Sequence, residues 1–260
     1  MKILILKGNA PRHNYFASEI KQLNGFETLT LGFNRLSKSR LSNTFLKSPK
    51  TFFSRSTKYL FKFIRGWNSK EQVFFNYPLS TQDLVVDSFN SSSSIKIMKE
   101  FEPDILLAFG IPIISNKIIS IPKYGAINLH GGISPEYKGG NTIFWPLYKG
   151  DINNVGATIH YMVKKVDSGK VISKVYPEIS PIDDEFSVSV KTFKLATSEM
   201  VNIVNWIKCY NKKIPGSEQN EKGNLYLAKH RTFLVDLLGP LKIKNKLAKV
   251  FLKQRVKRFY

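Results

Sequence analysis

An asparagine, a histidine and an aspartate are the residues of this sequence whose types and spacing could do chemistry. Asn128 and His130 are two residues apart in an apolar run, so on a strand their side chains point to the same face. Asp167 follows a second strand-like run. An amide, an imidazolium and a carboxylate can hold an oxyanion and move a proton, which acyl transfer to an amine requires. A turn residue beside a hydrogen-bonded histidine is the alternative interpretation of Asn128 and His130.

These residues need strands and helices to position them. Short apolar runs and amphipathic segments alternate along the chain, which predicts an α/β fold, a Rossmann-like and mainly parallel sheet with helices on both faces. Sites in such sheets lie at the carboxyl ends of the strands, where Asn128, His130 and Asp167 fall. We expect strands near 2–7, 26–31, 83–87, 104–109, 125–130, 155–163 and 170–177, and helices near 12–23, 94–101, 115–120, 141–149 and 187–210.

The length and composition suit one main domain with a small C-terminal extension. With 260 residues, 42% of them hydrophobic, the chain can bury a full core. We expect a catalytic domain at 1–210 and, at 211–260, one hairpin from the segment 212–229 followed by a basic tail. The single cysteine, Cys209, excludes an internal disulfide framework and predicts a reducing cytoplasm. No apolar run is long enough to predict a membrane span.

The residues from 103 to 172 resemble the family of formyltransferases that use 10-formyltetrahydrofolate. Family members share a strand, an I-P-x-x-G linker, an N-x-H motif, a Tyr-basic-Gly turn, and a G-x-T strand that leads into D-x-G. The order and the spacing of these motifs hold in this chain. The corresponding segments are PDILLAFG at 103–110, IPKYGAINLH at 121–130, YKG at 137–139, GATIHYM at 156–162 and VDSG at 166–169.

The resemblance implies a role for each matching position. Asn128 would orient the formyl carbonyl, His130 would be the charged donor and proton carrier, and Asp167 would keep His130 protonated and draw a proton from the attacking amine. Main-chain groups of two loops would hold the pterin of 10-formyltetrahydrofolate, and no residue spacing suggests a metal site. The loop positions are Pro112, Ile113 and Ile114, and Val163, Lys164, Lys165 and Val166.

The chain departs from the family pattern in two places. The usual S-x-L-P after the histidine reads Gly132-Ile133-Ser134-Pro135, which removes one hydroxyl and relocates another. Some relatives have an arginine where this chain has Gly140.

The acceptor implied by the resemblance is the amine of an amino sugar, linked to a nucleotide and destined for a surface polysaccharide. The sequence of residues 128–144 is similar to the sequences of that group. Relatives that formylate methionyl-tRNA carry a C-terminal domain of about a hundred residues, whereas about fifty remain here after the last expected helix. A methionyl-tRNA formyltransferase and an inactive basic binding protein on the same scaffold are the alternatives.

The formal net charge of +21 is unevenly distributed. The segment 35–65 holds nine basic residues and the segment 241–260 holds eight, and neither holds an acidic one. Basic residues interleaved with apolar ones predict peripheral contact with an anionic membrane, at the inner membrane surface, as one option. A solvated basic surface is another, nucleic acid is disfavoured, and a homodimer stays open.

Other residues have simpler interpretations. The segment 8–13 follows the first strand and opens the first helix, where an anion could bind, although an ordinary turn explains it too. His160 lies in an alternating strand and is predicted to be a packed histidine rather than a catalytic one. Trp145 and Trp206, at helical positions, are predicted to be core residues.

Overall fold

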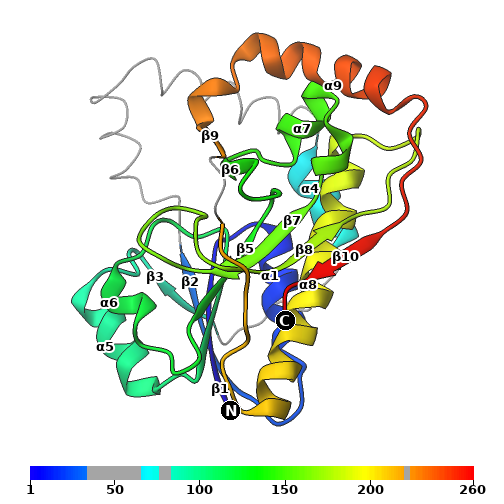
Figure 1. The fold of residues 1–260 in the computed structure, drawn as a ribbon. Helices are drawn as coiled ribbons and strands as arrows, with labels where there is room; N and C mark the ends of the chain where they lie inside the picture. The colour runs from blue at the N-terminus through cyan, green and yellow to red at the C-terminus, as the bar shows by residue number, and fades with distance from the viewer. Residues whose placement is uncertain (34–65, 76–82, 220–222) are drawn as a thin grey trace.

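A computed structural model of the chain describes residues 1–33, 66–75, 83–219 and 223–260 (Figure 1). Within these ranges the main sheet has the strand order β10-β8-β7-β5-β4-β1-β2-β3. The strands β3, β2, β1, β4 and β5 pair in parallel, whereas β7, β8 and β10 add antiparallel strands at one edge. The predicted α/β class with a mainly parallel sheet is therefore confirmed.

All strands of the main sheet except β10 form close to where they were expected. Those of the main sheet are β1 (Lys2–Lys7), β2 (Glu27–Phe33), β3 (Leu84–Val86), β4 (Ile105–Phe109), β5 (Ala126–His130), β7 (Ala157–Tyr161), β8 (Val171–Tyr176) and β10 (Arg255–Arg258). The helices are α1 (Pro11–Lys21), α4 (Trp67–Phe74), α5 (Ser92–Phe101), α6 (Asn116–Ile119), α7 (Phe144–Lys149), α8 (Glu185–Tyr210) and α9 (Phe233–Leu247), with 3₁₀ turns η1 (Ile152–Asn154) and η2 (Ala228–His230).

Helices cover both faces of the sheet because its central strands are apolar on both sides. Ile3 and Ile5 of β1 pack with α1 and α8 in one core cluster. Leu4 and Leu6, which alternate with them, pack in a second cluster with Met98 of α5 and with α6. The alternation along β1 thus divides the core into two layers (Figure 1).

The helix starts follow local capping chemistry. Asp184 accepts a hydrogen bond from the Ser187 backbone N–H and begins α8, the long helix that crosses the sheet. Ser91 caps α5 in the same way through the backbone N–H of Ser94, as the serine run suggests. Trp145 of α7 is buried in a core cluster, whereas Trp206 of α8 is only partly buried against the main core.

The C-terminal part differs from the expected hairpin and basic tail. Its strand β9 (Asn224–Tyr226) pairs in parallel with β6 (Tyr137–Gly139), α9 packs on α7, and β10 joins the edge of the main sheet. The carboxylate of Glu199, 1% exposed on α8, holds the guanidinium of Arg258 at 2.8 Å. The tail is therefore built into the fold by distant partners, and the division into 1–210 and 211–260 stays a prediction.

The basic segment 35–65 lies outside the described residues. The basic segment 241–260 is described and forms the second half of α9 and the strand β10. Among the residues that the structure describes, no helix is long and apolar enough to cross a bilayer.

Candidate active site

Two neighbouring strands bring an amide and an imidazole together. β5 pairs with β7 in antiparallel register, and this places Asn128 opposite His160. The side-chain nitrogen of Asn128 lies 3.3 Å from Nε2 of His160, and Nδ1 of His160 lies 2.8 Å from the carbonyl oxygen of Tyr161. Because a carbonyl only accepts, Nδ1 of His160 carries a proton and Nε2 is the nitrogen that faces Asn128.

Asp167 reaches this pair through a turn that the V-D-S-G segment makes. Its φ of 47° is in the left-handed region, which aspartate tolerates better than most residues and which is common at functional sites. A Cβ at Gly169 would lie 1.9 Å from the carbonyl oxygen of Tyr161, so only glycine allows the turn to close against β7. Both positions fold the carboxylate back toward β5 and β7.

The two carboxylate oxygens of Asp167 each face one histidine. Oδ2 lies 3.4 Å from Nδ1 of His130, and Oδ1 lies 3.5 Å from Nε2 of His160. Oδ2 also accepts a hydrogen bond of 2.9 Å from the backbone N–H of Gly139. Asn128, His160, Asp167 and His130 thus form one continuous chain of polar groups.

This arrangement shifts two pKa values. Burial by itself raises the pKa of Asp167, but the charge of His130 and the contact with His160 outweigh burial and hold that pKa well below its ordinary value. Burial lowers the pKa of His130 below its ordinary value, although Asp167 and the carbonyl of Tyr137 favour the charged ring. The carboxylate therefore stays ionised, and His130 is mostly neutral at pH 7.

Asn128, His160 and Asp167 line a small cavity, and His130 is oriented away from it. His130 is 6% exposed, and its Nε2 lies 2.7 Å from the carbonyl oxygen of Tyr137. Gly132 makes room for this orientation, because a Cβ there would lie 2.8 Å from Nε2 of His130. The missing hydroxyl of the S-x-L-P pattern is at this position. The relocated one, on Ser134, is buried without a hydrogen-bond partner among the described residues.

His160 lines the candidate site, although the sequence analysis predicted a packed histidine there rather than a site residue. The prediction of a packed strand histidine is right about its burial, since it is 2% exposed. The same residue nevertheless lines the cavity between Asn128 and Asp167. The available signal was its register, because an antiparallel β5–β7 pair puts residue 160 opposite residue 128.

The cavity has a volume of about 100 Å³ and opens at the carboxyl ends of β4 and β5. Two loops form its walls, one after β4 and one between β7 and β8, and they contain all seven positions predicted for the pterin. The lining residues are Ile111, Pro112, Ile113, Ile114, Ile119, Asn128, His160, Met162, Val163, Lys164, Lys165, Val166 and Asp167. Apolar walls with a few converging polar groups are typical of small-molecule sites.

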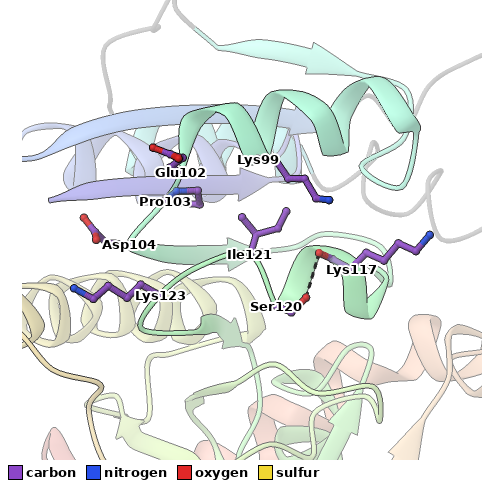
Figure 2. Close-up of a pocket in the computed structure, with 8 residues that line it drawn as sticks. All are labelled: Lys99, Glu102, Pro103, Asp104, Lys117, Ser120, Ile121 and Lys123. Carbon is purple, nitrogen blue, oxygen red and sulfur yellow. Dashed lines mark hydrogen bonds between the residues drawn. The ribbon is translucent and has the colours of Figure 1, made fainter.

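A larger hollow, of about 560 Å³, lies at the opposite end of the same sheet. Figure 2 shows its eight lining residues, which come from α5, from the segment that enters β4, and from α6 and the loop after it. The amino groups of Lys99 and Lys117 lie on one side, and the carboxylates of Glu102 and Asp104 on the other (Figure 2). The carboxylate of Asp104 accepts a hydrogen bond from the Lys2 backbone N–H at 2.8 Å, so it has a structural partner.

The turn after β1 is occupied by its own side chains. Nδ1 of His13 accepts a hydrogen bond of 3.2 Å from the Ala10 backbone N–H, and the ring packs edge-on against Phe109. Arg12 pairs with the buried carboxylate of Glu71. These contacts favour the structural interpretation of the segment 8–13 over an anion site.

Comparison with known proteins points to one family. A family model described as formyl transferase matches residues 79–204. The bifunctional polymyxin resistance protein ArnA of Wigglesworthia glossinidia brevipalpis is 31% identical over 137 residues, which cover 52% of this chain and 20% of that protein. The match therefore spans about a fifth of the length of this relative.

Solved structures share the fold at low sequence identity. A sugar N-formyltransferase from Shewanella sp. superposes with a TM-score of 0.57 at 15% identity, covering 93% of this chain and 88% of the other. The formyltransferase PseJ from Anoxybacillus kamchatkensis, solved with UDP-4,6-dideoxy-4-formamido-L-AltNAc and tetrahydrofolate, superposes with a TM-score of 0.51 at 19% identity, covering 95% and 97%.

Proposed function

We propose that the chain transfers a formyl group from 10-formyltetrahydrofolate to the amine of an amino sugar, a proposal that the match of residues 79–204 to the formyl transferase family model supports. The observation that carries this proposal is the convergence of Asn128, His160 and Asp167 on one cavity at the carboxyl edge of the sheet, with His130 behind the carboxylate. Apolar walls next to these groups can bind a flat ring and leave its reactive arm at the polar end.

The carbonyl oxygen of the formyl group needs hydrogen-bond donors when it becomes an oxyanion. The amide of Asn128 has two N–H donors, and one of them faces His160. The other can donate to the oxyanion, while the unprotonated Nε2 of His160 accepts the first and fixes the direction of the amide. His130 faces Asp167 in this structure, so we assign its contribution to the proton rather than to the oxyanion.

Proton transfer is the second requirement of the reaction. As the amine nitrogen attacks the formyl carbon, a C–N bond forms and the nitrogen becomes positive. The ionised Asp167 stabilises that charge. The imidazole of His130, which faces Oδ2 of Asp167, takes the proton, because the carboxylate offsets the charge on the ring. The bond from carbon to N10 of the folate then breaks, and N10 receives the proton that the imidazole took from the amine.

The folate-binding part of the proposal rests on the two loops of the cavity. Residues 112–114 and 163–166 line the cavity beside Ile111 and Met162, and their backbone N–H and C=O groups would be the partners of the pterin. A pterin edge alternates donors and acceptors, so main-chain groups are suitable partners for it. PseJ, which has a similar fold, was solved with tetrahydrofolate.

The choice of an amino sugar is supported by the relatives rather than by a sugar-binding contact. Structures of similar fold include sugar N-formyltransferases, and PseJ was solved with a nucleotide-linked formamido sugar. The role in surface polysaccharide synthesis and the nucleotide carrier are parts of the same proposal.

The test is mass spectrometry of nucleotide-linked amino sugars incubated with the protein and 10-formyltetrahydrofolate. We expect a mass gain of one formyl group on an amino sugar, which the Asn128→Ala variant forms about a hundredfold more slowly because it lacks the amide donor. Formylation of methionyl-tRNA with no formylated sugar would overturn the choice of acceptor. Absence of folate binding in calorimetry would overturn the enzyme assignment.

A further inference from the structure

The helix α9 has two apolar faces, although it packs on the protein with only one. Its inward face includes Gly239, Ile243 and Leu247, which are buried beside α7. On the outward side, Leu234, Leu237, Leu238 and Leu241 recur at the spacing i, i+3, i+4 and i+7, which aligns them along the helix. We call these four residues the leucine stripe.

The leucine stripe is open to solvent along its whole length. Its four side chains are between 45% and 64% exposed, and α9 lies along the outer edge of the molecule (Figure 1). Single exposed leucines are ordinary, but four in one row on one helix make a continuous apolar surface that soluble proteins seldom leave uncovered.

The charged residues around the leucine stripe indicate the kind of partner that can cover it. Lys242, Lys244 and Lys246 follow the stripe on the same helix, and Lys249 comes next in the chain. Asp236 is the only acidic residue between 223 and 260, and it is 3% exposed with its carboxylate 2.6 Å from Nε of Arg231. The surface of α9 is therefore apolar and cationic with no exposed carboxylate.

We propose that the leucine stripe of α9 docks the protein onto an anionic lipid bilayer, with the leucines at the level of the acyl chains and the following lysines at the headgroups. A helix with an apolar face and lysines beside it binds an interface in this way, through buried area together with attraction to acidic lipids. A second copy of the chain fits less well, because it would bring the same lysines face to face without a carboxylate between them.

The helix α9 is linked to the active site through the strand that precedes it. The strand β9 precedes α9 and pairs with β6, and the Gly139 amide of β6 donates to Asp167. The strand β9, which leads into α9, is thus two hydrogen-bonded steps from the carboxylate of the active site.

The experiment is flotation of the full chain with vesicles of phosphatidylcholine alone or with a quarter of phosphatidylglycerol. We expect binding to the anionic vesicles only, and a partition coefficient at least about tenfold lower for the Leu234→Asp/Leu238→Asp variant. The matched control is Val85→Asp, because Val85 is 65% exposed on β3 at the opposite edge of the sheet and should change nothing. Lys244→Glu with Lys249→Glu should lower binding about fivefold per lysine while the stripe is intact.

Each other outcome overturns the proposal. Equal binding of the leucine variant would move the contact to another basic segment, and equal binding to neutral vesicles would remove the role of the lysines. A dimer in analytical ultracentrifugation that the leucine variant dissociates, with no vesicle binding, would show that a second copy covers the stripe. Circular dichroism and thermal unfolding check that every variant folds, and the exposed positions make that the expected result.

Discussion

Two hollows lie at opposite ends of β4, and the larger one is not the one in which reactive groups converge. The hollow at the amino end is the larger, about 560 Å³ against about 100 Å³, and its charged side chains lie apart around an open surface (Figure 2). The cavity at the carboxyl end is small, but an amide, a carboxylate and an imidazole share it, and a second imidazole lies behind the carboxylate. Converging buried groups, rather than volume, distinguish a reactive site from a surface depression.

The largest difference between the two ends should come from exchanging one carboxylate for an amide at each. Asp167→Asn removes the negative charge that both histidines face, and we expect turnover to fall about a thousandfold, within the range for groups that handle a proton. Asp104→Asn is the matched control at the amino end, and its turnover should stay within about twofold of the original, because it touches no reacting group. Rates are measured by formation of formylated product, and comparable losses in both variants would contradict the contrast.

The two histidines provide the next comparison, because both face Asp167. We expect His130→Gln to lower kcat about a hundredfold, because glutamine cannot take the proton. The pKa of His130 is shifted by burial and by the carboxylate of Asp167, as is typical of groups that handle a proton. We expect about tenfold for His160→Gln, because an amide can still bond to Asn128. The pH profile separates the roles: loss of one ionisation in the His130 variant alone supports the assignment, whereas its loss only in the His160 variant would reverse it.

The lowered pKa of His130 predicts how stability depends on pH. An unfolded chain binds the proton of this histidine more readily than the folded chain, so the contribution of His130 is present above its unfolded pKa and is lost as pH falls through the folded value. The lowered pKa of Asp167 acts in the same direction at more acidic pH. Unfolding by denaturant between pH 8 and pH 5 should show a smaller loss of stability in His130→Gln than in the original chain, and parallel curves would disprove this linkage.

The smallest effect should come from the charges of the larger hollow. Lys117→Ala together with Lys123→Ala removes two of its three amino groups, and we expect kcat and KM to stay within about twofold. The Michaelis constants for the folate and for the sugar are the measurement. A large rise in either constant would show that the amino end binds a substrate and would remove the contrast between the two hollows.

Most of the sheet could be predicted from the amino-acid sequence alone. The apolar runs at 2–7 and 104–109 are buried on both faces, and burial of a strand from both sides leaves its sequence with few alternatives. The proximity of Asn128, His130 and Asp167 could also be predicted from the sequence, because glycines and turns at fixed spacing bring these side chains to one edge of the sheet.

The positions of the remaining parts depend on contacts between residues that lie far apart in the sequence. The segment RVKR became β10 because distant Glu199 holds Arg258, and three-residue β9 formed because β6 was there to pair with it. Gly239 and Pro240 interrupt the pattern of α9, so packing on α7 rather than propensity supports that helix. His160 and the inward turn of His130 were hidden for the same reason. The role of His160 depends on Asn128, 32 residues away, and the orientation of His130 depends on the missing side chain at Gly132, and local sequence does not encode such contacts.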